Sequence, residues 1–154
     1  MALKGDMGYE QAHDISWFWD SIAVSHAAGG CASIKTAGSG VCLGGVQMAA
    51  YAVDPSGAKP LGVLTQKVTS YAGQTRVFRN LQNGEILPGE KCCLIRKGWL
   101  VTDMVIGSPV GGNPAYLGAS GNFATVQAEG APKVGRFETA KDGNGYAKVW
   151  LDIQ

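Results

Sequence analysis

The stretch PGEKCCLIRKGWLVTDMVIGSPVGGNPAYLG, residues 88–118, decides the fold expected of this chain. Two apolar runs, residues 92–95 and 99–104, flank Arg96-Lys97-Gly98, and a loop rich in glycine and proline then leads into residues 115–117. Each apolar run is interrupted too early to complete a helix, and the interruptions carry Pro-Gly, Lys-Gly and Gly-Asn-Pro turn signals. The stretch therefore predicts a small core of tightly turned antiparallel strands, and it contains no catalytic motif.

Short apolar runs separated by turn signals continue on both sides of this stretch. Residues 134–139 and 146–153 are joined by Lys141-Asp142-Gly143-Asn144-Gly145, a strong hairpin signal. In the second of these runs apolar residues alternate with others, which places Trp150 on the more polar face of the strand. Further strands are expected at residues 48–53, 61–68, 75–78 and 123–127. This spacing predicts an all-β sandwich or barrel.

Composition agrees with such a fold and limits the partners. The chain has 154 residues, of which 23 are glycine, about twice the usual ~7% share. Its net charge is +1, from 13 basic and 12 acidic residues. The only candidate for a basic patch is the segment 76–79, Arg-Val-Phe-Arg, so we expect no nucleic-acid partner. A surface this poor in charge is expected to be covered in part by protein partners.

The beginning of the chain is expected to differ from the rest. Residues 1–14 are polar and contain glycine, which predicts an extended arm that orders only against another surface. Residues 15–154 are expected to form one β domain. We expect no membrane association and no secretion signal, because no leader-like apolar segment is seen and no run approaches the ~20 residues of a membrane span.

The aromatic residues leave two interpretations open. Residues 15–22 fit helical spacing as well as an extended strand. Trp17, Phe18 and Trp19 in that segment either close one end of the core or anchor a neighbouring subunit, since tryptophan is favoured at binding hot spots. In the same way, Trp150 is expected to be covered either by a loop or by another subunit.

No set of residues predicts catalysis, a metal or a cofactor. The four cysteines are Cys31, Cys42, Cys92 and Cys93. Cys92 and Cys93 are adjacent and would point to opposite faces of a strand, so they are badly placed to share a metal or a disulfide. His13 and His26 are the only histidines, and no nucleophile motif surrounds Cys31. We therefore expect free thiols and a protein that is not an enzyme.

Several motifs resemble those of one protein family. They are AVDPSG at 52–57, PLGVL at 60–64, KGWLVTDM at 97–104, GNPAYL at 112–117, SGN at 120–122, PKVGRF at 132–137, DGNGYAKV at 142–149, and LKG and DIS near the start. In this order and spacing the chain resembles the head decoration, or structural cement, proteins of tailed bacteriophages.

The resemblance implies a jelly-roll-like β-sandwich on the outer surface of the virion, made in the cytoplasm of the bacterial host. It would bridge neighbouring major capsid proteins and resist the pressure of packaged DNA without touching DNA. Such proteins form homodimers, favoured here, or homotrimers. The residues expected at the interfaces are Leu3, Lys4, Trp17, Phe18, Trp19 and Trp150. The alternative is a carbohydrate- or surface-binding β-sandwich that uses Trp17, Trp19 or Trp150 as a stacking platform.

Overall fold

The computed structural model describes residues 3–4, 12–20, 26–37, 47–67, 85–86 and 89–154, and these residues form an all-β protein. The strands are β1 (Leu3–Lys4), β2 (Ala12–Asp14), β3 (Phe18–Trp19), β4 (His26–Ala27), β5 (Cys31–Thr36), β6 (Met48–Ala50), β7 (Pro60–Lys67), β8 (Glu85–Ile86), β9 (Cys92–Thr102), β10 (Val105–Ile106), β11 (Pro114–Leu117), β12 (Phe123–Ala124), β13 (Lys133–Phe137) and β14 (Ala147–Asp152). A single turn of 3-10 helix, η1 (Ala119–Gly121), is the one helical element among the described residues.

Most strands belong to one mixed sheet in the order β10-β12-β11-β13-β14-β9-β7-β5-β6-β3, and β4 pairs with β8 in a separate small sheet. The pairs are antiparallel as expected, except that β3 with β6 and β10 with β12 run parallel. Within the described residues, no helix is long and apolar enough to cross a membrane.

Strand β9 is the common neighbour of four strands, β1, β2, β7 and β14. The sequence predicted two strands here with a break at residues 96–98, and that prediction was wrong, because β9 is one strand of 11 residues. Its backbone stays paired through the expected break, since Lys97 lies opposite Asp152 and the Ile153 N–H donates to the Arg96 carbonyl. Gly98 bends the strand instead of ending it, with a φ of 131° that disfavours a side chain.

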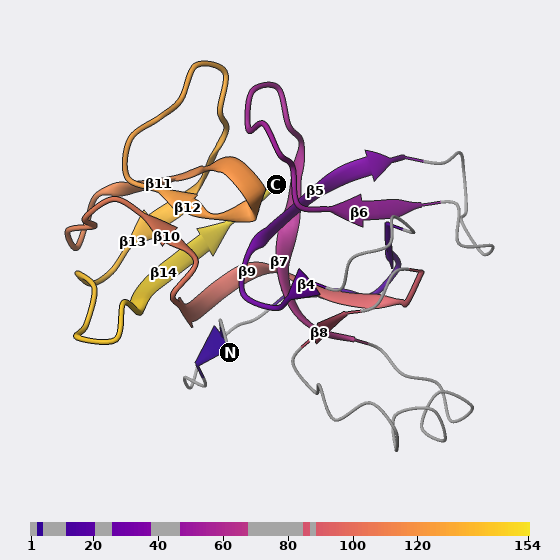
Figure 1. Cartoon of the computed structure of the whole chain (residues 1–154), viewed down its shortest axis with the longest axis horizontal. Coiled ribbons are helices and arrows are strands. Elements are labelled where there is room, and N and C mark those ends of the chain that lie inside the picture. The colour runs from indigo at the N-terminus through magenta and orange to yellow at the C-terminus, as the bar shows by residue number, and fades with distance from the viewer. Residues whose placement is uncertain (1–2, 5–11, 21–25, 38–46, 68–84, 87–88) are drawn as a thin grey trace.

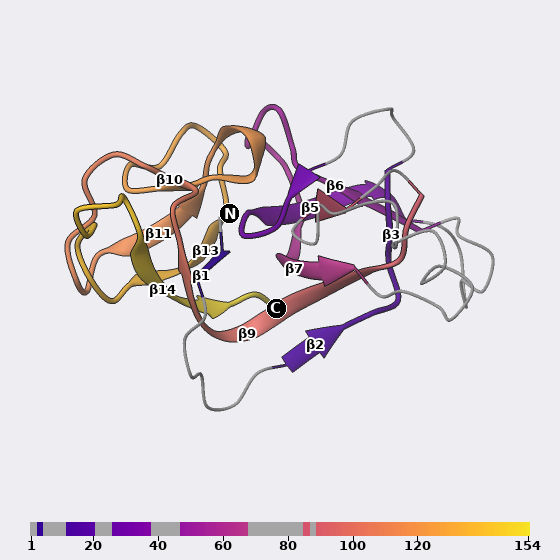
Figure 2. The same ribbon diagram turned by 60° about the horizontal axis from the view of Figure 1, so that its bottom comes forward.

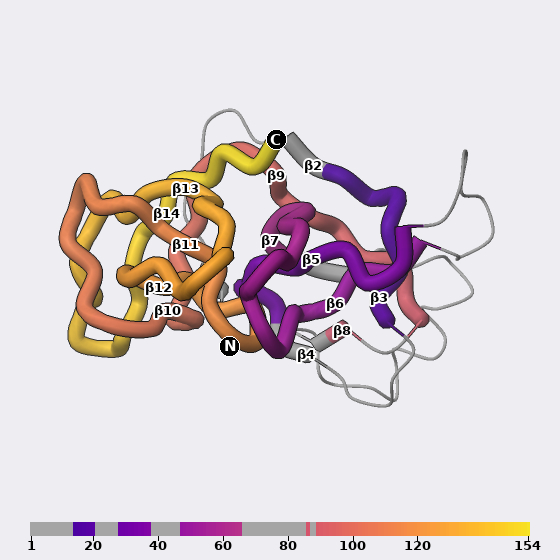
Figure 3. The backbone as a smooth tube through the Cα atoms, turned by 90° about the horizontal axis from the view of Figure 1, so that it is seen from above, coloured from indigo at the N-terminus to yellow at the C-terminus, as the bar shows by residue number. Residues whose placement is uncertain are grey.

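The sheet folds into two lobes that share β9 (Figure 1; Figure 3). The C-terminal lobe contains β10 to β14 and the second half of β9, and the N-terminal lobe contains β3, β5, β6, β7 and the first half of β9. Leu94 belongs to the core of the N-terminal lobe, and Leu100 belongs to the core of the C-terminal lobe. Because side chains alternate along β9 and the strand bends at Gly98, this one strand contributes to both cores.

The C-terminal hairpin is confirmed as predicted. Strands β13 and β14 pair antiparallel, and their turn is held by the Asp142 carboxylate, which accepts the backbone N–H groups of Asn144 and Tyr146 at 2.9 Å each. Val149 and Leu151 are fully buried, as the alternation predicted.

Several other predicted elements are shorter than expected or lie outside the described residues. The apolar runs at 48–53 and 123–127 form strands only at their first residues, β6 and β12, and the run at 75–78 lies outside the described residues. Of the segment 15–22, residues 18–19 form β3, and none of its described residues is helical. Of the expected arm 1–14, the described pieces β1 and β2 pair with the chain's own β9 (Figure 2).

Candidate functional site

The outward side of β9, β14 and β13 carries two neighbouring tryptophans. Trp99 on β9 lies directly opposite Trp150 on β14, and their ring centroids are 4.7 Å apart with an interplanar angle of 60°. Arg136 on β13 follows in the same row, because it lies opposite Trp150. Both indoles are half-buried, so each ring covers part of the other while the pair stays open to solvent. We call this surface the tryptophan face.

The alternation of residues in β9 and β14 produces this face. Leu100 and Leu151 point into the core of the C-terminal lobe, which sends their neighbours Trp99 and Trp150 outward. The sequence identified Trp150 as a residue in need of cover, and the structure shows that Trp99 supplies part of it. Trp99 itself was missed as a surface residue, although its position one residue before the buried Leu100 carries the same signal.

Basic side chains surround the two indoles. The Lys148 ammonium lies 5.5 Å from the centre of the Trp99 ring, within reach of a cation–π interaction. Lys97 and Lys133 are exposed on either side. The Arg136 Nε donates to the Glu138 carboxylate at 2.6 Å. The face therefore combines an aromatic centre with a mostly cationic rim.

A hollow of about 320 Å³ lies beside the Trp150 ring. It is lined by Lys133, Gly135, Arg136, Trp150 and Asp152. Gly135 contributes no side chain to it, and this position has no room for one, because a Cβ there would contact the backbone of Trp150. The hollow is thus a built feature of the β13–β14 pair.

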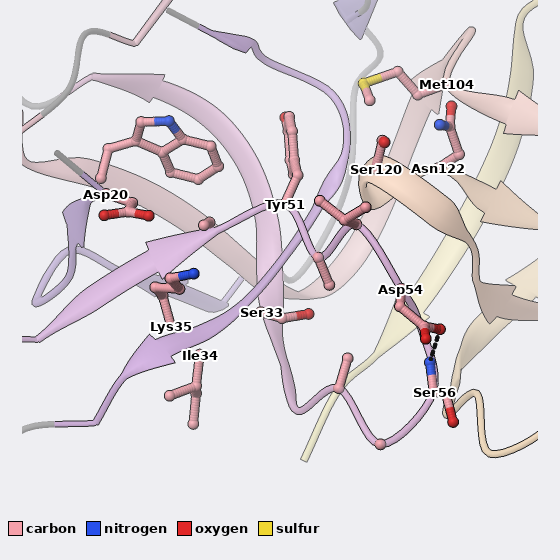
Figure 4. Close-up of a pocket in the computed structure, with 16 residues that line it drawn as sticks. Asp20, Ser33, Ile34, Lys35, Tyr51, Asp54, Ser56, Met104, Ser120 and Asn122 are labelled. Carbon is pink, nitrogen blue, oxygen red and sulfur yellow. Dashed lines mark hydrogen bonds between the residues drawn. The ribbon is translucent and has the colours of Figure 1, made fainter. Parts of the chain in front are cut away.

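A second, larger groove of about 770 Å³ lies where the lobes meet (Figure 4). The N-terminal lobe contributes Ser33 and Tyr51 among others, and Met104, Ser120 and Asn122 come from the chain around β10 to β12. The Tyr51 hydroxyl accepts the Gly30 N–H at 3.1 Å, and its ring packs edge-on against Trp19 with centroids 5.0 Å apart.

Two features of this groove bear on what it could hold. The Ser33 side chain is 3% exposed, and its hydroxyl has no hydrogen-bond partner within the described part of the chain. The groove wall at Asp54 is fixed by a turn in which the Asp54 carboxylate accepts the Ser56 N–H at 2.9 Å. The groove therefore has walls of mixed polar and apolar character, and one of them is fixed by this turn.

The residues that the sequence predicted as interface anchors lie in different environments in the structure. Trp17 and Trp19 are 8% and 1% exposed and belong to the core of the N-terminal lobe, where the Trp17 Nε1 donates to Asp14 at 3.1 Å. Phe18 is half-buried, with the Lys91 ammonium 6.0 Å from its ring centre. Leu3 and Lys4 pair by their backbone with Thr102 and Val101, close to the tryptophan face. Trp150 is the proposed anchor that the structure places beside a second open indole.

The thiols show no sign of activation. Burial raises the pKa of Cys31 and of Cys92 to about 12, so both remain neutral at physiological pH. Cys93 is buried as well, none of these three cysteines forms a disulfide within the described part of the chain, and Cys42 lies outside it. Among the described residues, no group of three or more potential ligands could hold a metal ion.

No protein-family model matches the chain, and no curated protein matches it. Its function is therefore argued from its own motifs and from the geometry of the two sites.

Proposed function

We propose that this protein is a phage head decoration protein that binds the outer surface of the capsid and bridges neighbouring major capsid proteins. The tryptophan face carries the proposal. It presents two adjacent, partly exposed indoles on paired strands of the sheet, and Trp is among the residues that dominate binding energy at protein interfaces. Strands hold such anchors more precisely than loops do.

The mechanism is mechanical and needs no catalytic group. A protein that binds the assembled shell and not its dissociated subunits stabilises the shell by linkage, by an amount that grows with its concentration over its dissociation constant. A symmetric oligomer would place several tryptophan faces against adjacent capsid proteins at once, and we favour a homodimer over a homotrimer. The motif resemblance adds further parts to this proposal, which are a jelly-roll-like topology, an N-terminal arm, a location on the virion and a non-enzymatic role.

The direct test is to mix the purified protein with undecorated phage heads and to measure occupancy by cryo-electron microscopy and co-sedimentation. We expect the wild-type protein to decorate the heads. Trp150→Ala should weaken binding by about 30-fold or more, the effect of losing an anchor worth at least ~2 kcal/mol. Val110→Ala removes an exposed apolar side chain from a loop and serves as the control with unchanged binding. Bare heads at saturating wild-type protein would refute the proposal.

A second candidate is a carbohydrate-binding module, and the same pair of indoles favours it, because open aromatic rings also stack on sugars. Trp17 and Trp19 are buried in this structure, which leaves Trp150, together with Trp99, as the stacking platform. A glycan-array screen with wild-type protein and Trp150→Ala distinguishes the two functions. Saturable glycan binding that the substitution abolishes, without any binding to heads, would favour the module.

A further inference from the structure

We infer that the tryptophan face recognises an acidic protein surface, and that a carboxylate side chain of the capsid partner enters the hollow beside Trp150. The inference rests on the proposed function, since it names the chemistry of the partner at that same face. It follows from the distribution of charge around the indoles and from the shape of the hollow.

Positive charge is concentrated on this face. The face carries four cations and two carboxylates, whereas the whole chain has 13 basic and 12 acidic residues. The residues concerned are Lys97, Lys133, Arg136, Lys148, Glu138 and Asp152. The remaining residues of the chain therefore carry slightly more negative than positive charge. The tryptophan face thus attracts a negatively charged partner more strongly than the net charge of the whole chain would indicate.

The cations on the face are positioned to act outward. Lys97 and Lys133 are exposed and form no ion pair with the described residues. The Asp152 carboxylate also lines the hollow, and its residue pairs with Lys97 on the neighbouring strand. A carboxylate that approaches the face would meet net positive charge at the Lys133–Arg136 end of the hollow.

Arg136 gives the hollow its specificity for a carboxylate. Its Nε is used by Glu138, but a guanidinium has five N–H donors in a planar fork, so its terminal nitrogens can still donate to a second group. Arginine binds carboxylates through two parallel hydrogen bonds, and these charge-assisted bonds are stronger than neutral ones. The hollow, which Arg136 and Trp150 both line, provides the space in which the carboxylate would lie, next to the Trp150 ring.

A protein carboxylate fits these features better than a nucleic acid does. Proteins that hold the phosphate backbone gain their affinity from many Lys and Arg contacts to phosphates at once. This face offers four cations and two carboxylates, and the carboxylates would repel phosphates. An acidic segment of a capsid protein needs only one or two such contacts around an apolar anchor, which is the arrangement around Trp150.

The test measures binding to undecorated heads at low and high NaCl with charge-reversed variants. Arg136→Glu and Lys133→Glu should each weaken binding about tenfold or more at low salt. Wild-type affinity should fall as NaCl rises, because the contacts at the rim of the face are screened, and the two variants should lose much of that dependence. Lys59→Glu makes the same change of charge at an exposed position in the N-terminal lobe and should bind like the wild type. Arg136→Gln, which removes charge without adding repulsion from Glu138, should give an intermediate loss.

Each outcome has a distinct meaning when circular dichroism shows the variants to be folded. Wild-type binding that is independent of salt, with both charge-reversed variants equal to Lys59→Glu, would overturn the inference and leave the decoration function standing. Stronger competition by single-stranded or duplex DNA than by poly-glutamate of equal charge would also overturn it, because the partner would then be a phosphate backbone. Displacement of the protein from heads by poly-glutamate at least as effectively as by DNA would support it. No binding to heads under any condition would overturn the proposed function and the inference together.

Discussion

Replacing Gly135 by alanine should destabilise the C-terminal lobe. Gly135 lies on β13, where it pairs with Leu151 of β14. A Cβ at this position would contact the Trp150 carbonyl oxygen and would lie 2.9 Å from the Trp150 carbonyl carbon and 3.2 Å from the Leu151 Cα. All three are backbone atoms, so they cannot move aside by changing a rotamer. The two strands must separate, or β13 must twist, to admit one methyl group.

The magnitude follows from the cost of overpacking. Forcing an extra carbon into a closely packed site costs about 1–3 kcal/mol, while the lower backbone entropy of alanine in the unfolded chain returns about 0.4–1 kcal/mol. A net loss of about 1–2 kcal/mol is expected from these two effects. In a chain of this length each kcal/mol lowers the melting temperature by about 2–4 °C. Urea denaturation followed by tryptophan fluorescence would report the loss as a lower midpoint with an unchanged m-value.

Gly143→Ala is the matched control, because it makes the same substitution in the turn of the same hairpin. No atom lies within 4 Å of a Cβ at Gly143, so its stability should stay within about 0.5 kcal/mol of the wild type. The close approach of β13 and β14 would be refuted if Gly135→Ala were as stable as Gly143→Ala. A lower m-value for Gly135→Ala would instead show that two-state unfolding had been lost, and the comparison would then be made by hydrogen exchange at β14.

Three further predictions concern polar side chains. Thr102→Val should lower the free energy of unfolding by about 1–3 kcal/mol in urea, because the buried hydroxyl donates to the Gly29 carbonyl at 2.9 Å and accepts a backbone N–H at 3.1 Å; a neutral result would contradict these bonds. Burial raises the pKa of Asp14, but hydrogen bonds from Ser16 and a nearby indole lower it by more, so the net pKa lies below 3.8. The stabilisation that this carboxylate contributes is therefore present above pH 3.8 and is lost as pH falls through the folded pKa. Asp14→Asn should therefore flatten the acid side of the stability profile, and an unchanged profile would count against this. For Cys31, burial raises the pKa from 9.0 to about 12, so the folded state keeps a proton that the unfolded chain loses, and stability should fall as pH rises through this window. Cys31→Ala should reduce that slope in urea titrations, and an equal slope would show that the thiol is not the cause.

The sequence predicted those parts of the fold that depend on residues close together in the chain. The hairpin of β13 and β14 follows from strict alternation around an Asp-Gly-Asn-Gly turn, and the Asp142 carboxylate caps that turn through residues within four positions of itself. The short apolar runs likewise identified β7 and β11 nearly to the residue. Signals of this kind act over a few residues, and no distant part of the chain has to cooperate with them.

The parts that could not be predicted depend on pairing between distant segments. Arg96, Lys97 and Gly98 have the composition of a turn, yet they stay in β9 because β14, some fifty positions later in the chain, supplies backbone partners there. Strand propensity is weak against such tertiary context. The tryptophan face has the same origin, since only the register of β9 against β14 places Trp99 beside Trp150. The groove between the lobes, with Ser33 on one wall and Ser120 on the other, assembles in the same way.

Strand β9 contributes side chains both to the two cores and to the tryptophan face. A substitution in β9 can therefore change stability as well as binding, whereas a substitution outside the cores can report on binding alone. Leu94 and Leu100 belong to different cores, so the strand cannot shift by one residue without reversing the faces of both lobes. Trp99 is held outward between the buried Gly98 and Leu100, so its replacement risks the fold as well as the face. Lys133 and Arg136 are exposed on β13, which pairs with β14 and not with β9, and they contribute to neither core. Nothing in the packing of the lobes requires a positive charge at these two positions. A loss of binding on reversing them, with stability unchanged, would therefore report recognition by the face, whereas losses at Trp99 would have to be corrected for unfolding first.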